Sequence, residues 1–275
     1  MSIDLAKLLT EVQVIAEQAG QVILDLLQKS DSLQVQLKAD ASPVTVMDKA
    51  ANQYIVEALT QLTPDIPVIS EEAIDISLSD AAQADYYWLV DPLDGTKGFI
   101  DGSKEYTVNI ALIEQYLPVL GVIVAPALGH SFVASTTTAA RWIRGGTSFD
   151  LSTVKAPRCK RVVLSHYHDM SRLAPYDGLQ VDLDGCGQVN SSLKFGLIAA
   201  GTYDYYPRLG PTSLWDTAAG QIVLERAGGA VVDFRGQRLQ YHLESGLLNP
   251  EFLAVGDAAI VSEVLEFCAM LRRKQ

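Results

Sequence analysis

A run of apolar residues from Tyr86 to Val90 leads directly into two aspartates, Asp91 and Asp94, with Gly95 immediately behind them. A short apolar run of this kind is typical of a buried strand. Carboxylates at the end of such a strand are costly to bury unless a cation accompanies them. The chain is therefore expected to place this strand inside a sheet and to collect polar side chains at its carboxyl end.

Helices precede this strand, and further strands follow it. Apolar residues recur at helical spacing over residues 3–28 and 48–62, which predicts two helices with one buried stripe each. Continuous or alternating apolar runs then predict consecutive strands of one sheet. They cover residues 68–70, 86–90, 106–113, 119–125 and 131–134. This order predicts an N-terminal α+β half with two helices and an antiparallel sheet.

A change of organisation is expected near Gly145–Gly146, where a polar stretch begins. We place the boundary between an N-terminal half, residues 1–145, which supplies most of the candidate metal ligands, and a C-terminal half, residues 146–275. In the C-terminal half, predicted strands and helices alternate, as in α/β folds. They cover residues 161–165, 191–200, 216–227, 230–234 and 257–273. The predicted fold class is therefore layered, α+β followed by α/β.

Acidic residues outnumber basic ones by 33 to 21, which gives a formal net charge of −12. Such a charge disfavours polymeric nucleic acid and anionic membrane surfaces as partners. Cys159, Cys186 and Cys268 form no Cys-x-x-Cys pair, so neither a disulfide framework nor a zinc site is predicted. We find no signal-peptide pattern and no apolar run of membrane-spanning length. These features predict a cytoplasmic protein, with or without peripheral contact at the inner membrane face.

Two further acidic segments stand at comparable positions. Glu71 and Glu72 close the short apolar strand that ends at Ser70, and Asp216 opens a helix after Trp215. Taken singly, these acids have ordinary roles as solvated loop charges or as a helix N-cap. Like charges about 4 Å apart repel by about 4 kcal/mol at an effective dielectric near 20, so a cluster of them requires bound cations. Carboxylate oxygens are the ligands of hard cations such as Mg²⁺.

Asp48 and Thr96 are candidates for activating water. Thr45, with Asp48 three residues on, resembles a helix capping box, and this structural role and a catalytic one are both open. In the catalytic interpretation Asp48 takes a proton from an attacking water, directly or through the Thr96 hydroxyl. Gly95 and Thr96 follow the aspartates at a turn, where backbone N–H groups commonly bind a phosphate.

Four motifs resemble the signature of the lithium-sensitive, Mg²⁺-dependent phosphatases typified by inositol monophosphatase, and they occur in that family's order. They are Pro43-Val-Thr-Val-Met-Asp48, Ser70-Glu-Glu72, Asp91-Pro-Leu-Asp-Gly-Thr96 and Trp215-Asp-Thr-Ala-Ala-Gly220. The resemblance implies an αβαβα fold and two or three Mg²⁺ ions, with inhibition by Li⁺. The implied ligands are Glu71, Asp91 and the Leu93 carbonyl for one ion, and Asp91, Asp94 and Asp216 for a second. The implied catalytic residues are Asp48, Glu71 and Thr96.

Three further stretches resemble the CysQ-like 3′(2′),5′-bisphosphate nucleotidases of that family. They are Thr96-Lys-Gly-Phe99, Ser191-Ser-Leu-Lys-Phe195 and Tyr206-Pro-Arg-Leu-Gly-Pro211. Arg208 stands two residues before Gly210, where inositol phosphatases carry an acid that binds a sugar hydroxyl, and a guanidinium suits a second phosphate instead. Lys194 adds a cation, although a solvated helix charge is the alternative. The implied substrate-binding residues are Gly95, Thr96, His168, Ser191, Lys194, Arg208 and Asp216.

The resemblance implies hydrolysis of the 3′-phosphate of adenosine 3′,5′-bisphosphate (PAP) to AMP and phosphate, in sulfur metabolism. PAPS, which would give APS, is a second substrate to test. Inositol monophosphatase or inositol polyphosphate 1-phosphatase activity is the alternative among enzymes, and a sensor that binds Mg²⁺ and nucleotide is the alternative outside them. The expected partner is a small nucleotide bisphosphate, and the expected assembly is a monomer or a homodimer.

Overall fold

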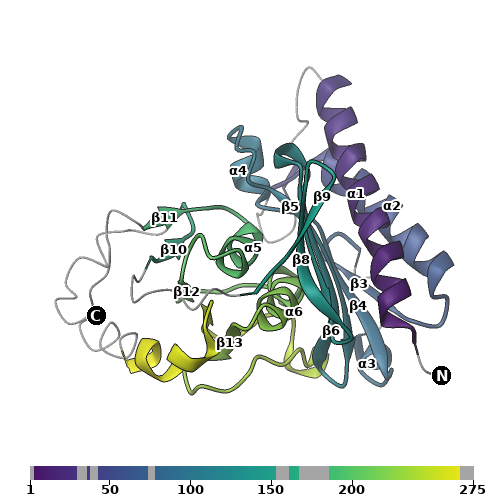
Figure 1. The fold of residues 1–275 in the computed structure, drawn as a ribbon. Coiled ribbons are helices and arrows are strands. Elements are labelled where there is room, and N and C mark those ends of the chain that lie inside the picture. Colours follow the sequence, from purple (N-terminus) through teal and green to yellow (C-terminus); the bar gives the residue numbers. More distant parts are fainter. Residues whose placement is uncertain are drawn as a thin grey trace.

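This computed structural model has a seven-stranded sheet at its centre (Figure 1). The structure describes residues 3–29, 36–37, 43–73, 78–152, 161–166 and 186–266. The strands of the large sheet lie in chain order: β3 (Val68–Ser70), β4 (Tyr86–Asp94), β5 (Thr107–Glu114), β6 (Leu117–Ala125), β7 (His130–Ser135), β8 (Thr138–Arg144) and β9 (Thr147–Asp150). β3 pairs parallel to β4, and the later neighbours pair antiparallel. The sheet is therefore mixed, where the sequence predicts a purely antiparallel one.

Two long helices, α1 (Leu5–Lys29) and α2 (Val46–Leu62), cover one face of the large sheet, and they confirm the two predicted N-terminal helices. The buried stripe of α1 includes Leu9 and Val12, as its helical spacing predicts. These side chains pack in one apolar core with Trp88 of β4. Burial of apolar surface stabilises a fold by about 25 cal/mol per Å². This core therefore holds the helices against the sheet.

The other face of the large sheet is covered by α5 (Leu193–Ala199) and α6 (Ala218–Arg226), which separate it from a second, three-stranded antiparallel sheet. The strand order of the second sheet is β12 (Tyr205–Arg208), β14 (Phe252–Val255) and β13 (Ala230–Asp233). Gly121 on β6 permits the close approach of α6, because a Cβ there would lie 2.4 Å from the Ile222 side chain. Val264, in helical residues 261–266, packs on the outer face of the second sheet. The layer order is thus αβαβα.

Shorter elements connect these layers. They are β1 (Gln36–Leu37), β2 (Pro43–Val44), α3 (Leu78–Ala81), α4 (Thr96–Ile100), η1 (Pro126–Leu128), β10 (Val163–Leu164), β11 (Gly187–Gln188), η4 (Leu214–Asp216), η5 (Leu243–Ser245) and η6 (Ala258–Ile260). β1 pairs antiparallel with β2, and β10 pairs parallel with β11. The helix predicted over residues 216–227 is divided into η4 and α6. β12 and β14, of four residues each, are not among the predicted strands.

The hairpin of β8 and β9 is also missing from the predicted strands. Gly145 and Gly146 form its turn, with φ of 55° and 77°, and Arg144 pairs with Thr147. All four residues of β9 are exposed, so no apolar pattern marks the strand. The large sheet continues to Asp150, past the boundary predicted between residues 145 and 146. The division into two halves stays a prediction.

Candidate active site

A bulge at the end of β4 places Asp91 and Asp94 on the same face of the large sheet. Along a regular strand, residues three apart point to opposite faces. Asp91 pairs with Asn109 on β5 and Asp94 pairs with Thr107, so three steps on β4 oppose two steps on β5. The extra residue in the bulge restores the common face. A spacing of three in the sequence thus yields two carboxylates that can act together.

Glu71 reaches the same place through parallel pairing. Ser70, the last residue of β3, pairs with Val90 of β4, so Glu71 and Asp91 follow side by side. The Glu71 N–H donates to the Val90 carbonyl oxygen over 3.1 Å, which continues the ladder by one step. The structure therefore brings Glu71 to the sheet edge that the sequence predicts for it.

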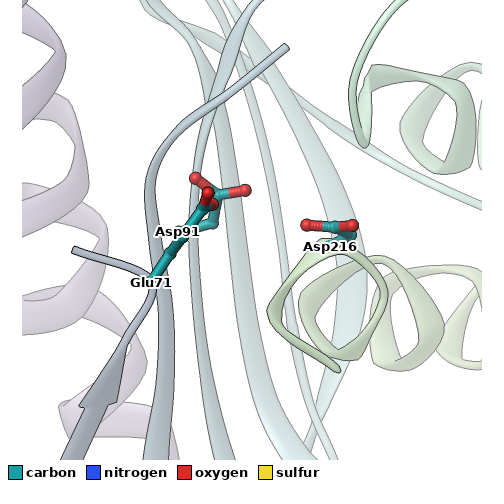
Figure 2. A group of neighbouring side chains, drawn as sticks. All are labelled: Glu71, Asp91 and Asp216. Carbon is teal, nitrogen blue, oxygen red and sulfur yellow. The ribbon is translucent and has the colours of Figure 1, made fainter. Parts of the chain in front are cut away.

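Asp216 comes from the opposite layer. It ends η4, just before α6 begins, and its Oδ2 accepts the Ser213 N–H at 2.9 Å. Figure 2 shows the Asp216 carboxylate facing those of Glu71 and Asp91. One oxygen of each of these three residues lies within 4.8 Å of the others. We call Glu71, Asp91 and Asp216 the acidic cluster, which three separate segments of the chain assemble.

The acidic cluster is electrostatically unfavourable by itself. Asp91 is 1% exposed, and burial, Glu71 and Asp94 raise its pKa well above the usual carboxyl value. Burial, Asp94 and Glu71 raise the pKa of Asp216 in the same way. A backbone N–H donor to each carboxylate opposes the shift only in part. A divalent cation would remove the repulsion, and an all-oxygen carboxylate set is what Mg²⁺ prefers. The residues present therefore fit such an ion.

Asp94 stands beside the acidic cluster and is held there by Ser192 and Asn109. Its Oδ2 accepts the Ser192 N–H at 2.6 Å, the Ser192 hydroxyl at 2.7 Å and the Asn109 side-chain amide at 3.3 Å. Neither Ser192 nor Asn109 is among the residues that the sequence predicts for the site. Ser192 is 98 residues from Asp94 along the chain, and Asn109 reaches Asp94 from the neighbouring strand β5, so both contacts depend on tertiary pairing.

Asp48 is the N3 partner in the capping box of α2, whose N-cap is Thr45, and it also contacts Thr96. Its Oδ2 accepts the Thr45 N–H at 2.8 Å and the Thr45 hydroxyl, which completes the capping box. Its Oδ1 lies 3.1 Å from Thr96 Oγ1, which also lies 3.0 Å from the Leu93 carbonyl oxygen. The Thr96 hydroxyl has one proton and donates to only one of these acceptors at a time. The capping role is thus present, and the same carboxylate is joined to the segment that follows Asp94.

A pocket of about 400 Å³ adjoins this centre and is lined by Asp94 and Asp216. Arg208 also lines it, and its guanidinium donates to the Pro211 carbonyl at 2.7 Å and to the Ser165 hydroxyl at 3.3 Å. The volume is typical of small-molecule sites. Three more predicted residues line it: Gly95, Ser191 and Lys194. We call this cavity the Arg208 pocket. It brings cationic side chains, Arg208 and Lys194, into one space with two carboxylates of the site.

Lys194 is buried, with 4% exposure, so the alternative of a solvated helix charge is wrong. Its Nζ donates to the carbonyl oxygens of Val189 at 3.1 Å and Ser191 at 2.6 Å, and lies 5.0 Å from the centre of the Tyr206 ring. Burial lowers the pKa of Lys194 to about 8, although Asp94 acts in the opposite direction. A buried titratable side chain with a shifted pKa that lines a pocket is a candidate for a functional site.

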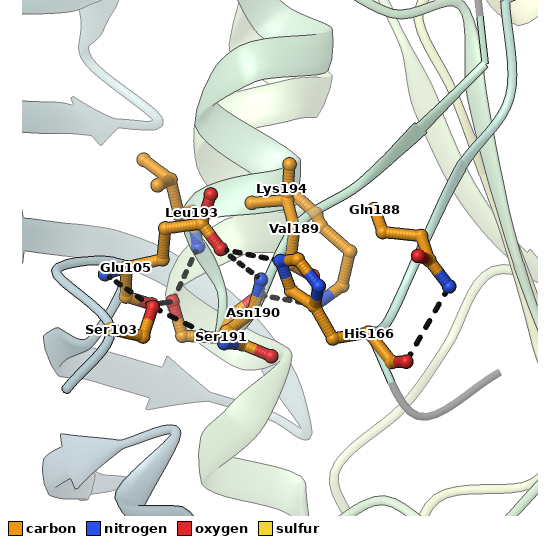
Figure 3. A network of polar contacts seen from close by, with 9 residues as sticks. All are labelled: Ser103, Glu105, His166, Gln188, Val189, Asn190, Ser191, Leu193 and Lys194. Atoms are coloured by element: carbon orange, nitrogen blue, oxygen red, sulfur yellow. Dashed lines mark hydrogen bonds and ion pairs between the residues drawn. The ribbon is translucent and has the colours of Figure 1, made fainter. Parts of the chain in front are cut away.

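Glu105 supports the turn that carries Ser191 and Lys194 (Figure 3). Its Oε2 accepts the Asn190 N–H at 3.1 Å and lies 3.0 Å from His166 Nε2, and its carbonyl oxygen accepts the Ser191 hydroxyl at 2.7 Å. Ser191 adopts φ of 56°, which is uncommon for a residue other than glycine. Glu105 is a further residue that the sequence does not predict. His168 lies outside the described residues, so its role stays a prediction.

Residues 4–266 match the model of the inositol monophosphatase family. The chain belongs to this family. It is 43% identical over 246 residues to the 3′(2′),5′-bisphosphate nucleotidase CysQ of Salmonella typhimurium, a match that covers 89% of this chain and 98% of the relative. CysQ of Haemophilus influenzae is 35% identical over 252 residues, 91% of this chain and 93% of the relative.

A solved structure agrees with these sequence matches. The crystal structure of CysQ from Bacteroides thetaiotaomicron, a bacterial member of the inositol monophosphatase family, has a TM-score of 0.76 and 31% identity over 92% of this chain and 98% of that chain. Within the family this chain is CysQ-like, and its predicted αβαβα fold is confirmed. Among the residues that the structure describes, no helix has both the length and the apolar character needed to cross a membrane.

Proposed function

We propose that this chain is a Mg²⁺-dependent 3′(2′),5′-bisphosphate nucleotidase that hydrolyses PAP to AMP and phosphate. The observation that carries the proposal is one pocket lined by Asp94, Asp216 and Arg208. A substrate with two phosphates suits it, because metal ions would neutralise one phosphate while the guanidinium binds the other. The CysQ relatives, at 35% to 43% identity, carry the name of this activity.

The metal ligands in this proposal are Glu71, Asp91 and the Leu93 carbonyl for one Mg²⁺, and Asp91, Asp94 and Asp216 for a second. When bound, the ions stabilise negative charge on the transferring phosphoryl group and on the leaving oxygen. Asp91 is suited to serve both ions, since Glu71, Asp94 and Asp216 all act on its carboxylate. A third ion and inhibition by Li⁺ belong to the same proposal.

Residues of the chain itself hold and move the proton. Thr96 Oγ1 donates to Asp48 Oδ1 and so presents a lone pair to the water that attacks phosphorus. As the water oxygen bonds to phosphorus, its proton passes toward the pair of Thr96 and Asp48 or to Glu71. The bond from phosphorus to O3′ breaks, and O3′ takes up a proton from solvent water. The N–H groups of Gly95 and Thr96 would bind the reacting phosphate.

The Arg208 pocket would receive the rest of the nucleotide. Arg208 and Lys194 would bind the second phosphate, and Ser191 and His168 the ribose or the base. Because the guanidinium of Arg208 already donates to Pro211 and Ser165, it is held in place before substrate arrives. The proposal includes a cytoplasmic monomer or homodimer that acts on a small nucleotide.

Phosphate release from PAP by the purified protein tests this function. We expect release with Mg²⁺, none after chelation by EDTA, and less when Li⁺ is added. PAPS, inositol 1-phosphate and inositol 1,4-bisphosphate belong in the same series. Faster release from either inositol phosphate than from PAP would support the alternative enzymes, and PAP binding without release at any Mg²⁺ concentration would support the sensor.

A further inference from the structure

Asp94 differs from the acidic cluster in how its carboxylate is held. Its Oδ2 accepts three hydrogen bonds, from the Ser192 N–H at 2.6 Å, the Ser192 hydroxyl at 2.7 Å and the Asn109 amide at 3.3 Å. Ser192 is 2% exposed and Asn109 is 0% exposed. Within the part of the chain that the structure describes, every hydrogen bond to the Asp94 carboxylate ends on Oδ2. Three donors on one oxygen fix the rotation of the carboxylate, and Oδ1 is left for another ligand.

The side-chain amide of Asn109 points its N–H groups toward this carboxylate, and its own carbonyl oxygen is left without a hydrogen-bond donor among the described residues. Its Nδ2 donates both to Asp94 Oδ2 and, over 2.7 Å, to Ser192 Oγ. Its Oδ1 is buried and has no hydrogen-bond partner among the described residues. A buried amide oxygen without a partner destabilises a fold. An Asn in this position is therefore poorly explained by packing alone, and is explained if its N–H groups are needed to orient Asp94.

Ser192 also connects the two carboxylates that line the Arg208 pocket. Its Oγ lies 3.0 Å from the backbone carbonyl oxygen of Asp216. The hydroxyl has one proton, and a carboxylate is a stronger acceptor for it than a backbone carbonyl. Ser192 lies between Ser191 and Lys194, so the turn that lines the pocket is bonded directly to Asp94. A shift of this turn would move Asp94, and a shift of Asp94 would move the turn.

We propose that Ser192 and Asn109 are positioning residues that orient Asp94 as a metal ligand and thereby couple Mg²⁺ binding to nucleotide binding. The inference rests on the proposed function. Neither residue is assigned contact with the substrate or the reacting atoms. Partners that orient a metal ligand typically contribute about 10- to 100-fold to metal affinity.

The test is Mg²⁺ binding to the substrate-free protein, measured by titration calorimetry on Ser192→Ala and Asn109→Ala. Each variant should bind Mg²⁺ about tenfold more weakly than the wild type. Each should also need more Mg²⁺ for half-maximal activity and regain most of its kcat at saturating Mg²⁺. Because both residues act on one oxygen, the double variant should lose less affinity than the two single losses combined.

Ser131→Ala is the matched control. Ser131 is a buried serine that donates to Glu17 at 2.9 Å, between β7 and α1, away from the acidic cluster. This variant should lose one buried hydrogen bond without any change in Mg²⁺ affinity. Circular dichroism and thermal unfolding establish that all variants are folded.

The coupling between metal binding and nucleotide binding is measured by the affinity for PAP with and without a divalent ion. In the wild type, PAP should bind more tightly when a non-hydrolysing divalent ion such as Ca²⁺ is present, and Ser192→Ala should reduce this gain. Mg²⁺ affinity and Mg²⁺ requirement equal to the wild type in both single variants would overturn the proposal. If the wild type binds Mg²⁺ but releases no phosphate from PAP, the proposed function fails, whereas the comparison of Mg²⁺ affinities still decides the role of Ser192.

Discussion

The acidic cluster and the Arg208 pocket are assembled in different ways, although Asp216 belongs to both. Asp91 lies in the buried strand β4, Glu71 follows β3, which pairs with β4, and Asp216 ends η4, so regular secondary structure and strand pairing place the cluster. The pocket residues depend on contacts between distant segments, such as Arg208 with Ser165. We infer that regular secondary structure positions the residues of the reaction, whereas tertiary contacts between distant segments position the residues that select the substrate. The two regions should therefore respond differently to substitution.

Asp91→Asn should break the acidic cluster and have the largest effect. Loss of a carboxylate shared by both proposed metal ions should lower kcat by about 10³-fold on PAP and on inositol 1-phosphate alike, since several kcal/mol of charge stabilisation disappear. The metal-free variant should unfold at or above the wild-type temperature, because a buried charge has been removed. Steady-state kinetics measure the loss of kcat, and thermal unfolding in EDTA measures the stability of the metal-free variant. A selective loss on one substrate would contradict the proposed role.

Arg208→Glu should break the pocket and leave the acidic cluster in place. We expect kcat/KM for PAP to fall by about 10- to 100-fold, since hydrogen bonds to charged groups contribute about 1.5–3 kcal/mol. Turnover of inositol 1-phosphate should change far less. Arg235→Glu, at an exposed turn, makes the same change of charge away from the site and is the control. Equal losses on both substrates would remove the specificity argument.

Lys194 gives the pocket a dependence on pH. Because burial lowers its pKa to about 8, the ammonium group loses its proton as the pH rises through that value. Attraction for the second phosphate is lost with it, so kcat/KM for PAP should fall several-fold on the alkaline side. Lys194→Met should remove this alkaline decline, and inositol 1-phosphate should show little of it. An unchanged pH profile in the variant would assign the decline to another group.

The acidic cluster gives the stability of the protein its own dependence on pH, which should be the smallest of these effects. The pKa values of Asp91 and Asp216 are raised in the folded protein. The metal-free protein therefore loses stability as the pH rises from the ordinary carboxyl value of 3.8 through the raised values, where the unfolded chain binds fewer protons than the folded one. Mg²⁺ removes this penalty. The gain in Tm from Mg²⁺ should be small near pH 5 and should grow toward neutral pH, and a constant gain would contradict the account.

The same contrast explains which features the sequence predicts. Asp91, Asp94 and Glu71 are recognisable because each ends an apolar run, and the buried stripe of α1 follows from local spacing. The bulge in β4 and the parallel pairing of β3 depend on neighbouring strands, and no local pattern reveals them.

Asn109 and Ser192, which hold Asp94 in place, are not predicted from the sequence for a related reason. Asn109 and Ser192 are 83 residues apart, and Ser192 and Asp94 are 98 residues apart. Contacts at such separations exist only after the layers have packed. The exposed strand β9 has a single apolar residue, Phe149, and no apolar periodicity, so Gly145–Gly146 is interpreted from sequence as a boundary and proves to be a hairpin turn.

The identity of the phosphate that is removed tests the central claim most directly. We would incubate the wild-type protein and Mg²⁺ with PAP in ¹⁸O-labelled water and identify the products by chromatography and mass spectrometry. If the acidic cluster binds the 3′-phosphate while Arg208 binds the 5′-phosphate, the products are unlabelled 5′-AMP and phosphate that carries one ¹⁸O atom. Formation of adenosine 3′-phosphate, or label in the nucleotide, would contradict the account.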